Sequence, residues 1–214
     1  MALANYTDLK TSIAGWLNRR DLTAVIPDFI RLAEDDINAR LRDRRMQKRV
    51  EATFTGQPVA LPSDWIEAVR VSPEGEALPL EPVSLVRLQE LRATRQPLVT
   101  PAPGDPQAGK PLYFAVNGGL LELYPAPGTS LTLEMTYFAK LPRLTDAAPT
   151  NWLLDEDAGV HLYGALIQAA PYLKDDARLA VWAALFKEKI EARNAVSRLA
   201  AYAGGALKRA RRGF

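Results

Sequence analysis

The proline residues of this chain are unevenly distributed, and their distribution limits where helices can form. Of the 16 prolines, 14 lie between Pro58 and Pro149, and only Pro27 and Pro171 lie outside that window. Because proline lacks a backbone N–H and clashes with the preceding turn of a helix, the window is expected to hold strands and loops. We therefore predict an α+β fold with one discontinuous, mainly α-helical bundle, residues 1–50 and 150–205, and a proline-rich antiparallel β insertion, residues 51–149.

Apolar residues at helical spacing predict two helices in the N-terminal flank. The first has Thr7 as its expected N-cap and ends at the polar stretch 18–21. The second begins near Pro27, because proline is well suited to the first turn of a helix. Its apolar positions recur at intervals of three and four: Ile26, Ile30, Ala33, Ile37 and Leu41.

The C-terminal flank also predicts two helices. Residues 158–172 are apolar on nearly every side, which is typical of a buried helix, and Pro171 is expected to break it. Asp176 is the expected cap of a longer helix that ends at the pair Gly204-Gly205. The buried stripe predicted for this helix is Leu179, Trp182, Phe186 and Ile190. Trp16 and Trp182 are both interpreted as core residues.

Strands are predicted in the proline-rich middle. Strict alternation of apolar and polar residues predicts a half-buried strand over 131–138. Residues 112–116 and 120–124 flank Asn117-Gly118-Gly119 and predict a hairpin, because Asn-Gly supplies the positive φ angles of a tight turn. Weaker patterns predict strands over 50–55 and 65–71, a helix over 84–93 and a long exposed loop over 96–111.

Composition excludes several classes of function. The chain has 214 residues, 48% of them hydrophobic, so it can bury a core. It has no cysteine and a single histidine, which removes disulfides, thiolate chemistry and multi-histidine metal sites. The N-terminus lacks the pattern of a secretion signal and no apolar stretch is long enough to span a membrane. We expect a soluble intracellular product that is not an enzyme and has no cofactor or metal.

Positive charge is concentrated in two short segments although the net charge is only +2. The first continues the second predicted helix and contains Arg40, Arg42, Arg44, Arg45, Lys48 and Arg49. The second, residues 206–214, follows a glycine pair and is expected to be a flexible basic arm that becomes ordered on a partner. A solvated helix end and an unstructured solubilising tail are the simpler interpretations of the two segments.

Other polar features favour structural roles over chemistry. The acidic clusters 155–157 and 175–176 are explained by the preference of helix N-termini for negative charge. His161 lies among apolar residues and is interpreted as a core or interface histidine with satisfied hydrogen bonds. The glycine pairs at 118–119 and 204–205 lack the sequence context of a phosphate-binding loop and are interpreted as a turn and a cap.

Several blocks of the sequence, in this order, resemble the head-to-tail adaptor (connector) proteins of tailed bacteriophages. They are the opening ANYTDLKTSIAGWLNRRDLTAVIPDFIRLAEDDINARLR, then ALPSDWIEAVRV, LTLEMTYFAKLPRLTDAAPTNWLL and LYGALIQAAPYLKDDARLAVW. The resemblance extends from Asn5 to about Leu199 and leaves out the loop 96–110 and the last fifteen residues.

The resemblance implies a structural role in the virion neck, at the head-tail junction, after assembly in the host cytoplasm. Such adaptors form a ring, usually of twelve copies, that docks beneath the portal protein, extends the DNA channel and meets tail or nozzle proteins. The resemblance also suggests that the arm contacts the portal through Leu207, Lys208, Arg209, Arg211, Arg212 and Phe214. The basic segment 40–49 is then expected to contact neighbouring subunits or the portal and to leave the genomic DNA unbound. The alternative is a nucleic-acid-binding protein that uses both basic segments on phosphates.

Overall fold

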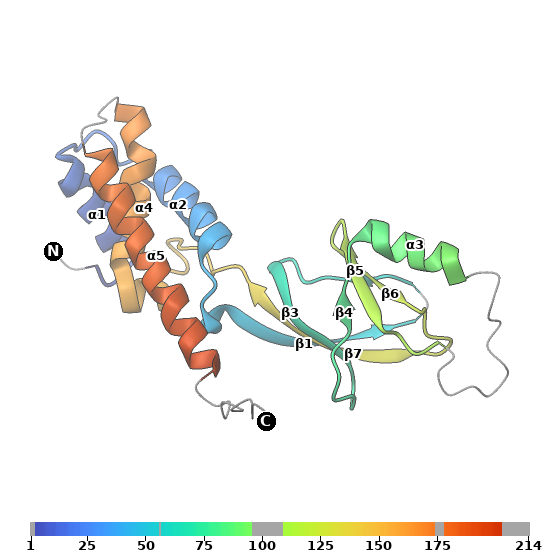
Figure 1. The fold of residues 1–214 in the computed structure, drawn as a ribbon. Coiled ribbons are helices and arrows are strands. Elements are labelled where there is room, and N and C mark those ends of the chain that lie inside the picture. The colour runs from blue at the N-terminus through green and yellow to red at the C-terminus, as the bar shows by residue number, and fades with distance from the viewer. Residues whose placement is uncertain (1–2, 56, 96–108, 174–177, 203–214) are drawn as a thin grey trace, which may run out of the picture. The chain divides into compact units, whose positions relative to one another are not determined.

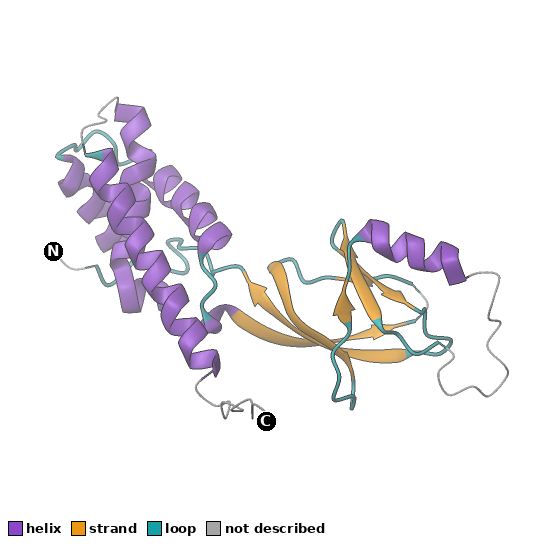
Figure 2. Cartoon of the chain, viewed as in Figure 1, coloured by secondary structure: helices purple, strands orange, loops and turns teal. Residues whose placement is uncertain are grey.

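The computed structural model describes residues 3–55, 57–95, 109–173 and 178–202. The chain divides into a helical unit, Met1–Arg44 with Leu141–Phe214, and a β-rich unit, Arg45–Lys140. Among the described residues, every strand lies in the β-rich unit (Figure 2). The α+β class is therefore confirmed. The junctions at 44/45 and 140/141 lie earlier in the chain than the prolines suggested, because Leu141 and Leu144 are buried in the helical unit despite the prolines around them.

The described residues of the helical unit form four helices: α1 (Tyr6–Leu17), α2 (Ile26–Arg40), α4 (Trp152–Leu173) and α5 (Leu179–Tyr202). Helix α4 packs against the other three, and the four helices are drawn together in Figure 1. The apolar stripe predicted for α2 is at most 1% exposed at every position. On α5, Trp182, Phe186 and Ile190 are buried as predicted. Residues 174–177 and the pair 204–205, where the cap and the end of α5 were expected, lie outside the described residues.

The N-cap predicted for the first helix was wrong by two residues. Asn5 is the N-cap of α1, and its side-chain oxygen accepts a hydrogen bond of 2.9 Å from the backbone N–H of Asp8. The backbone N–H of Tyr6 donates to the carbonyl of Pro149 at 2.7 Å. Two of the N–H groups that a helix start leaves free are therefore paired, one of them with a residue distant in the sequence.

Helix α4 begins at Trp152, before the predicted start. Asn151 accepts a hydrogen bond from the N–H of Leu154 and donates its amide to the carbonyl of Pro142. Asp157 interrupts the helix with φ −148° and ψ 72°, so the apolar stretch predicted from residue 158 is the second of two helical segments. Pro171 lies inside the last turn instead of ending the helix before it.

The described part of the β-rich unit contains two sheets. The first has the order β1-β7-β3, with β1 (Gln47–Phe54) and β3 (Trp65–Pro73) both antiparallel to the central β7 (Leu131–Ala139). The second has the order β2-β6-β5-β4, built from β2 (Val59–Ala60), β6 (Leu120–Tyr124), β5 (Tyr113–Asn117) and β4 (Glu81–Pro82). The predicted strands are confirmed to within a few residues. The two-residue strands β2 and β4 were not predicted, and β4 pairs with β5 in parallel although an antiparallel insertion was predicted.

The predicted hairpin joins β5 to β6, but its turn lies one residue later than expected. Asn117 pairs with Leu120, and the two residues between them, Gly118 and Gly119, have φ of 56° and 85°. A Gly-Gly pair therefore supplies the positive φ angles that Asn-Gly was expected to supply. Helix α3 (Leu85–Arg95) packs on this sheet, where the hydroxyl of Tyr124 donates to the carbonyl of Leu91 at 2.9 Å.

Candidate assembly surface

The first basic segment is not a continuation of α2. The helix ends at Arg40, Leu41 is extended, and a short 3₁₀ helix, η1 (Arg44–Met46), leads into β1. Arg42 ends the helix by donating its guanidinium to the carbonyls of Asn38 and Leu41, at 3.0 and 2.7 Å. The prediction of a helical basic run was therefore wrong, because the backbone that follows Arg40 is held by side chains of α5.

Two polar residues of α5 hold this backbone in place. The side-chain oxygen of Asn194 accepts from the N–H of Arg42 at 2.7 Å, and its amide donates to the carbonyl of Arg40 at 3.0 Å. The hydroxyl of Ser197 accepts from the N–H of Arg44 at 2.7 Å. These hydrogen bonds satisfy backbone groups that the end of α2 leaves free. Sequence reasoning missed both residues, since their partners are more than 150 positions away.

Arg193 anchors the same end of α5. Its guanidinium pairs with Asp43 at 3.2 Å and with Glu156 at 2.6 Å, and it lies 5.2 Å from the centre of the Trp152 ring. The side chains of Arg193 and Asp43 are only 17% and 10% exposed, so water screens this pair weakly. One turn earlier, Lys189 pairs with Asp157 at 2.7 Å. Two of the acids predicted to favour a helix start therefore also bind α4 to α5.

The predicted contact bases are placed in both units, and most of them have partners within their own unit. In the helical unit, Arg40 pairs with Asp36 at 2.8 Å, and Arg44 is exposed. In the β-rich unit, Arg45 is exposed, Lys48 pairs with Asp64 at 2.6 Å, and Arg49 pairs with Glu134. The paired bases are more than half exposed, so their side chains can still reach a partner. The arm residues Leu207 to Phe214 and most of the predicted loop, 96–108, lie outside the described residues.

Lys48, Asp64 and Tyr137 form a short polar chain at one end of the first sheet. The Tyr137 hydroxyl donates to Asp64 at 2.9 Å, and burial together with this hydrogen bond raises the pKa of Tyr137 to about 12. Burial opposes ionisation of Asp64, but the hydrogen bonds from Lys48 and Tyr137 outweigh it and hold the pKa of Asp64 below its ordinary value. The stacked ring of Trp65, 4.8 Å from that of Tyr137, covers the group. This arrangement links β1, the residue before β3 and the central β7.

The helical unit exposes apolar side chains on the outer side of α5. Val181, Val196 and Leu199 are 58, 67 and 73% exposed. Elsewhere on this unit, Leu32 of α2 is half exposed, and Trp16 of α1 is 40% exposed although it was predicted to be a core residue. Trp16 contacts Tyr163 through an edge-to-face ring arrangement, with the ring centroids 6.0 Å apart. Val196 and Leu199 are three residues apart and therefore neighbours on the helix surface, and grouped exposed apolar residues are typical of an interaction site.

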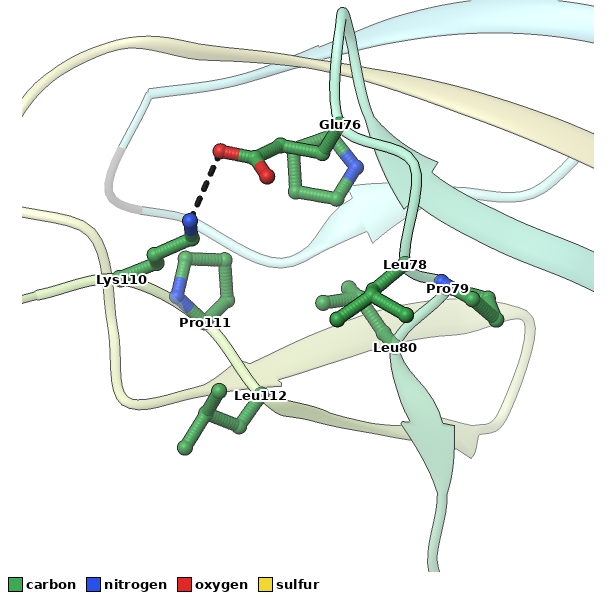
Figure 3. Close-up of a pocket in the computed structure, with 8 residues that line it drawn as sticks. Glu76, Leu78, Pro79, Leu80, Lys110, Pro111 and Leu112 are labelled. Atoms are coloured by element: carbon green, nitrogen blue, oxygen red, sulfur yellow. Dashed lines mark hydrogen bonds and ion pairs between the residues drawn. The ribbon is translucent and has the colours of Figure 1, made fainter.

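The β-rich unit has an open groove beside the turn that follows β3, shown in Figure 3. Its volume is about 300 Å³, and it is lined by Leu78, Pro79, Leu80, Pro111 and Leu112, with Glu76 and Lys110 paired across it at 2.8 Å. Leu78 is 80% exposed. The two charged residues of the groove pair with each other, and the rest of its lining is apolar.

The described residues assemble no candidate metal site. The described part of the chain contains no group of three histidine, cysteine, aspartate or glutamate side chains that could hold a metal ion. Among those same residues, no helix is both long and apolar enough to cross a membrane. Glu34 is buried and accepts a hydrogen bond from the N–H of Leu144 at 2.7 Å, and burial raises its pKa. It therefore fixes the chain after the β-rich unit.

His161 is buried as predicted, but the prediction that its hydrogen bonds are satisfied was wrong. The residue is 0% exposed, and neither ring nitrogen has a hydrogen-bond partner among the described residues. Burial lowers the pKa of His161 to about 4, although the charge of Asp157 acts in the opposite direction. The imidazole is therefore neutral at pH 7 and acts as a core residue.

Comparison with known proteins identifies the family. No curated protein matches the chain. Residues 4–210 match the family model described as SU10 adaptor protein, and the match includes both units and the basic segment 40–49. The chain therefore belongs to the SU10 adaptor protein family, a family of phage head-tail adaptors.

Proposed function

We propose that this adaptor forms a ring of twelve copies in the virion neck, docks beneath the portal protein and extends the channel for DNA. Its other side meets the tail or nozzle proteins, and assembly takes place in the host cytoplasm. Membership of a structural adaptor family supports the proposal. A ring subunit acts through shape and contact, so it needs interaction surfaces in place of a reaction centre.

The observation that carries the proposal is the exposure of Val196 and Leu199 on α5, 67 and 73%. Exposed aliphatic side chains lose unfavourable contact with water when another protein covers them. Subunits in a head-to-tail ring meet through two different faces. The outer side of α5 supplies one such face, and a second face that carries Trp16 or Leu32 supplies the other.

The basic residues have separate roles in this proposal. Arg40, Arg42, Arg44, Arg45, Lys48 and Arg49 contact neighbouring subunits, and Leu207, Lys208, Arg209, Arg211, Arg212 and Phe214 contact the portal. Arg40, Lys48 and Arg49 already pair with carboxylates of their own chain. Pairing reduces their attraction for phosphates, which suits a channel that DNA must pass through without being held.

Nucleic-acid binding is the competing function, and salt dependence separates the two. A protein that used both basic segments on phosphates would bind short duplex DNA with an affinity that falls steeply between low and physiological salt. We expect no appreciable binding at physiological salt. Tight, strongly salt-dependent binding by the purified protein would favour the competing function.

The ring is tested by mixing the purified protein with its cognate portal and imaging the product by electron microscopy. A symmetric ring on the portal is the expected result, and particles that carry the portal alone would contradict the proposal. A Val196→Asp/Leu199→Asp double variant should keep its circular dichroism spectrum and lose ring formation. Glu188→Gln, at another exposed position of α5, is the matched control and should assemble normally.

A further inference from the structure

The two edges of the first sheet differ in how they are protected. On β3, the register shifts between Trp65 and Glu67 and between Ala68 and Arg70, so Ile66 and Val69 have no partner on β7. Farther along this edge, the carbonyl of Val71 accepts from the N–H of Leu80 at 2.8 Å. Bulges and occupied backbone groups are the usual means by which proteins prevent a strand edge from pairing with another chain. The β3 edge is therefore closed to a further strand.

The β1 edge has none of these protections. All eight residues of β1, Gln47–Phe54, pair with β7 without a register shift, and the strand contains neither proline nor glycine. A regular exposed edge strand of this length is a template for another strand. The edges of the second sheet, β2 and β4, are each only two residues long.

Hydrogen bonding of β7 shows which backbone groups of β1 face outward. The carbonyl of Thr132 accepts from Glu74, which follows β3, at 2.9 Å. Residues of an antiparallel strand alternate between their two neighbours, so Thr132 and every second residue after it bond toward β3. The intervening residues bond toward β1, where their partners are Lys48, Val50, Ala52 and Phe54. The backbone groups of Gln47, Arg49, Glu51 and Thr53 therefore face outward, and no hydrogen bond to them is found within the described part of the chain.

We propose that β1 pairs antiparallel with β1 of a second copy of this chain, with Val50 opposite Val50. The two three-stranded sheets would then join into one continuous sheet of order β3-β7-β1-β1-β7-β3. In this register the outward-facing residues form the hydrogen-bonded pairs. Arg49 lies opposite Glu51 of the second copy, and Gln47 lies opposite its Thr53, each pair occurring twice.

Charge selects this register over its neighbours. A shift that keeps the outward groups paired moves the strands by two residues, because the alternate residues face inward. A shift in one direction places Arg49 opposite Arg49, and a shift in the other direction places Glu51 opposite Glu51. Like charges directly opposite each other destabilise a strand pair, and opposite charges stabilise it. The centred register is the one that places both arginines opposite glutamates.

An added strand would make favourable contacts on both faces of β1. Glu51 lies directly opposite Glu134 of its own chain, and Arg49 pairs with Glu134. Arg49 of the second copy would bring a positive charge to Glu51, which has no ion pair within the described part of the chain. On the inner face, Val50 and Ala52 are half-buried and pack against the core of the β-rich unit. A second Val50 extends that core.

This pairing goes beyond the proposed ring. A contact that is its own partner under two-fold symmetry closes on two copies, whereas a ring is built from contacts between two different faces. The β1 pair is therefore a state of the free protein. The β1 pairing is tested on the free protein, without the portal. A negative result in that test would not contradict the ring, and a negative result for the ring would not contradict the β1 pairing.

Cysteine cross-linking tests the centre of the pairing, because the chain has no cysteine of its own. In the proposed register, the two Val50 residues form a pair without hydrogen bonds, with Cα atoms about 4.5 Å apart, within the range of a disulfide. Oxidised Val50→Cys protein should therefore run as a covalent dimer on a non-reducing gel. Thr53→Cys is the matched control, because the two Thr53 residues would be roughly 20 Å apart at 3.4 Å per residue. Equal cross-linking of both variants would overturn the proposal.

Exchange of the two charges tests the register in solution. Sedimentation equilibrium of the unmodified protein should show a dimer that dissociates on dilution. Arg49→Glu alone or Glu51→Arg alone places like charges opposite each other and should sediment as a monomer with an unchanged circular dichroism spectrum. An equimolar mixture of the two variants restores both opposite-charge pairs and should again form dimers. A monomeric unmodified protein at its highest soluble concentration, or a mixture that stays monomeric, would refute the proposed pairing.

Discussion

Gly164 of α4 lies so close to Ala33 of α2 that a Cβ atom on Gly164 would be 3.0 Å from the Cβ of Ala33. The same atom would be 3.2 Å from the ring of Phe186 in α5. All three residues are buried. The glycine therefore allows three helices to approach one another at a single point, and this approach keeps α4 at the centre of the helical unit.

Replacement of Gly164 by valine should destabilise the helical unit. Valine adds three carbon atoms, for which Ala33 and Phe186 leave no free volume, and overpacking of a core costs about 1–3 kcal/mol of the free energy of unfolding. Urea denaturation of the purified protein measures the change. Gly159→Ala is the control, since its added Cβ would meet the flexible end of Lys189 instead of a helix. A Gly164→Val protein as stable as the control would show that the helices can separate without cost.

Arg193→Met should also destabilise the helical unit, by about 2 kcal/mol. The change removes a guanidinium that is 17% exposed from the carboxylates of Asp43 and Glu156, and weakly screened charges that lose a partner are costly. Lys187→Met removes an exposed pair with Glu191, 3.8 Å apart, and should change stability by less than about 1 kcal/mol. Thermal unfolding of both variants provides the comparison. Equal melting temperatures would mean that the Arg193 cluster does not bind α5 to the rest of the unit.

His161 should make the protein less stable in mild acid. Its pKa is about 4 in the folded state against 6.5 for an unperturbed histidine, so the unfolded chain binds more protons between these values. The contribution of neutral His161 to the free energy of unfolding is therefore fully present above pH 6.5. It decreases as the pH falls toward 4 and levels off below pH 4. The difference between the two pKa values corresponds to roughly 3 kcal/mol.

Comparison with His161→Phe isolates this effect from the titration of carboxylates. The difference in unfolding free energy between the two proteins should change with pH only between about 4 and 6.5, in the direction that favours the variant at low pH. Chemical denaturation at a series of pH values gives the two curves. Parallel curves over this range would show that the imidazole finds a partner for its proton inside the fold.

The elements themselves were predictable because their signals are local. The stripe Ile26 to Leu41 has the period of a helix, residues 131–138 have the period of a strand, and both periods reflect one buried face. The start of the second segment of α4 was also predictable, since the apolar run begins where Asp157 interrupts the helix. The family was identified from ordered blocks that include these same elements.

The geometry of the basic segment was not predictable, because residues distant in the sequence determine it. Nothing near Arg42 indicates that Asn194 and Ser197 hold the backbone there, or that α2 ends at Arg40. Composition alone suggested a helix that continues through the arginines. The edge position of β1 likewise depends on β7, about 80 residues later, and on the bulges that close the β3 edge.

Deletion of Leu207 to Phe214 should separate folding from portal attachment. The truncated protein should keep its melting temperature within about 1 °C, because the deleted residues belong to no hydrophobic pattern of the sequence. It should bind the portal more weakly, and the loss should be smaller at high salt, where charged contacts contribute less. Native gels or surface plasmon resonance with purified portal measure attachment. A variant with a glycine-serine segment of equal length controls for chain length, and unchanged attachment of both variants would contradict the role assigned to the arm.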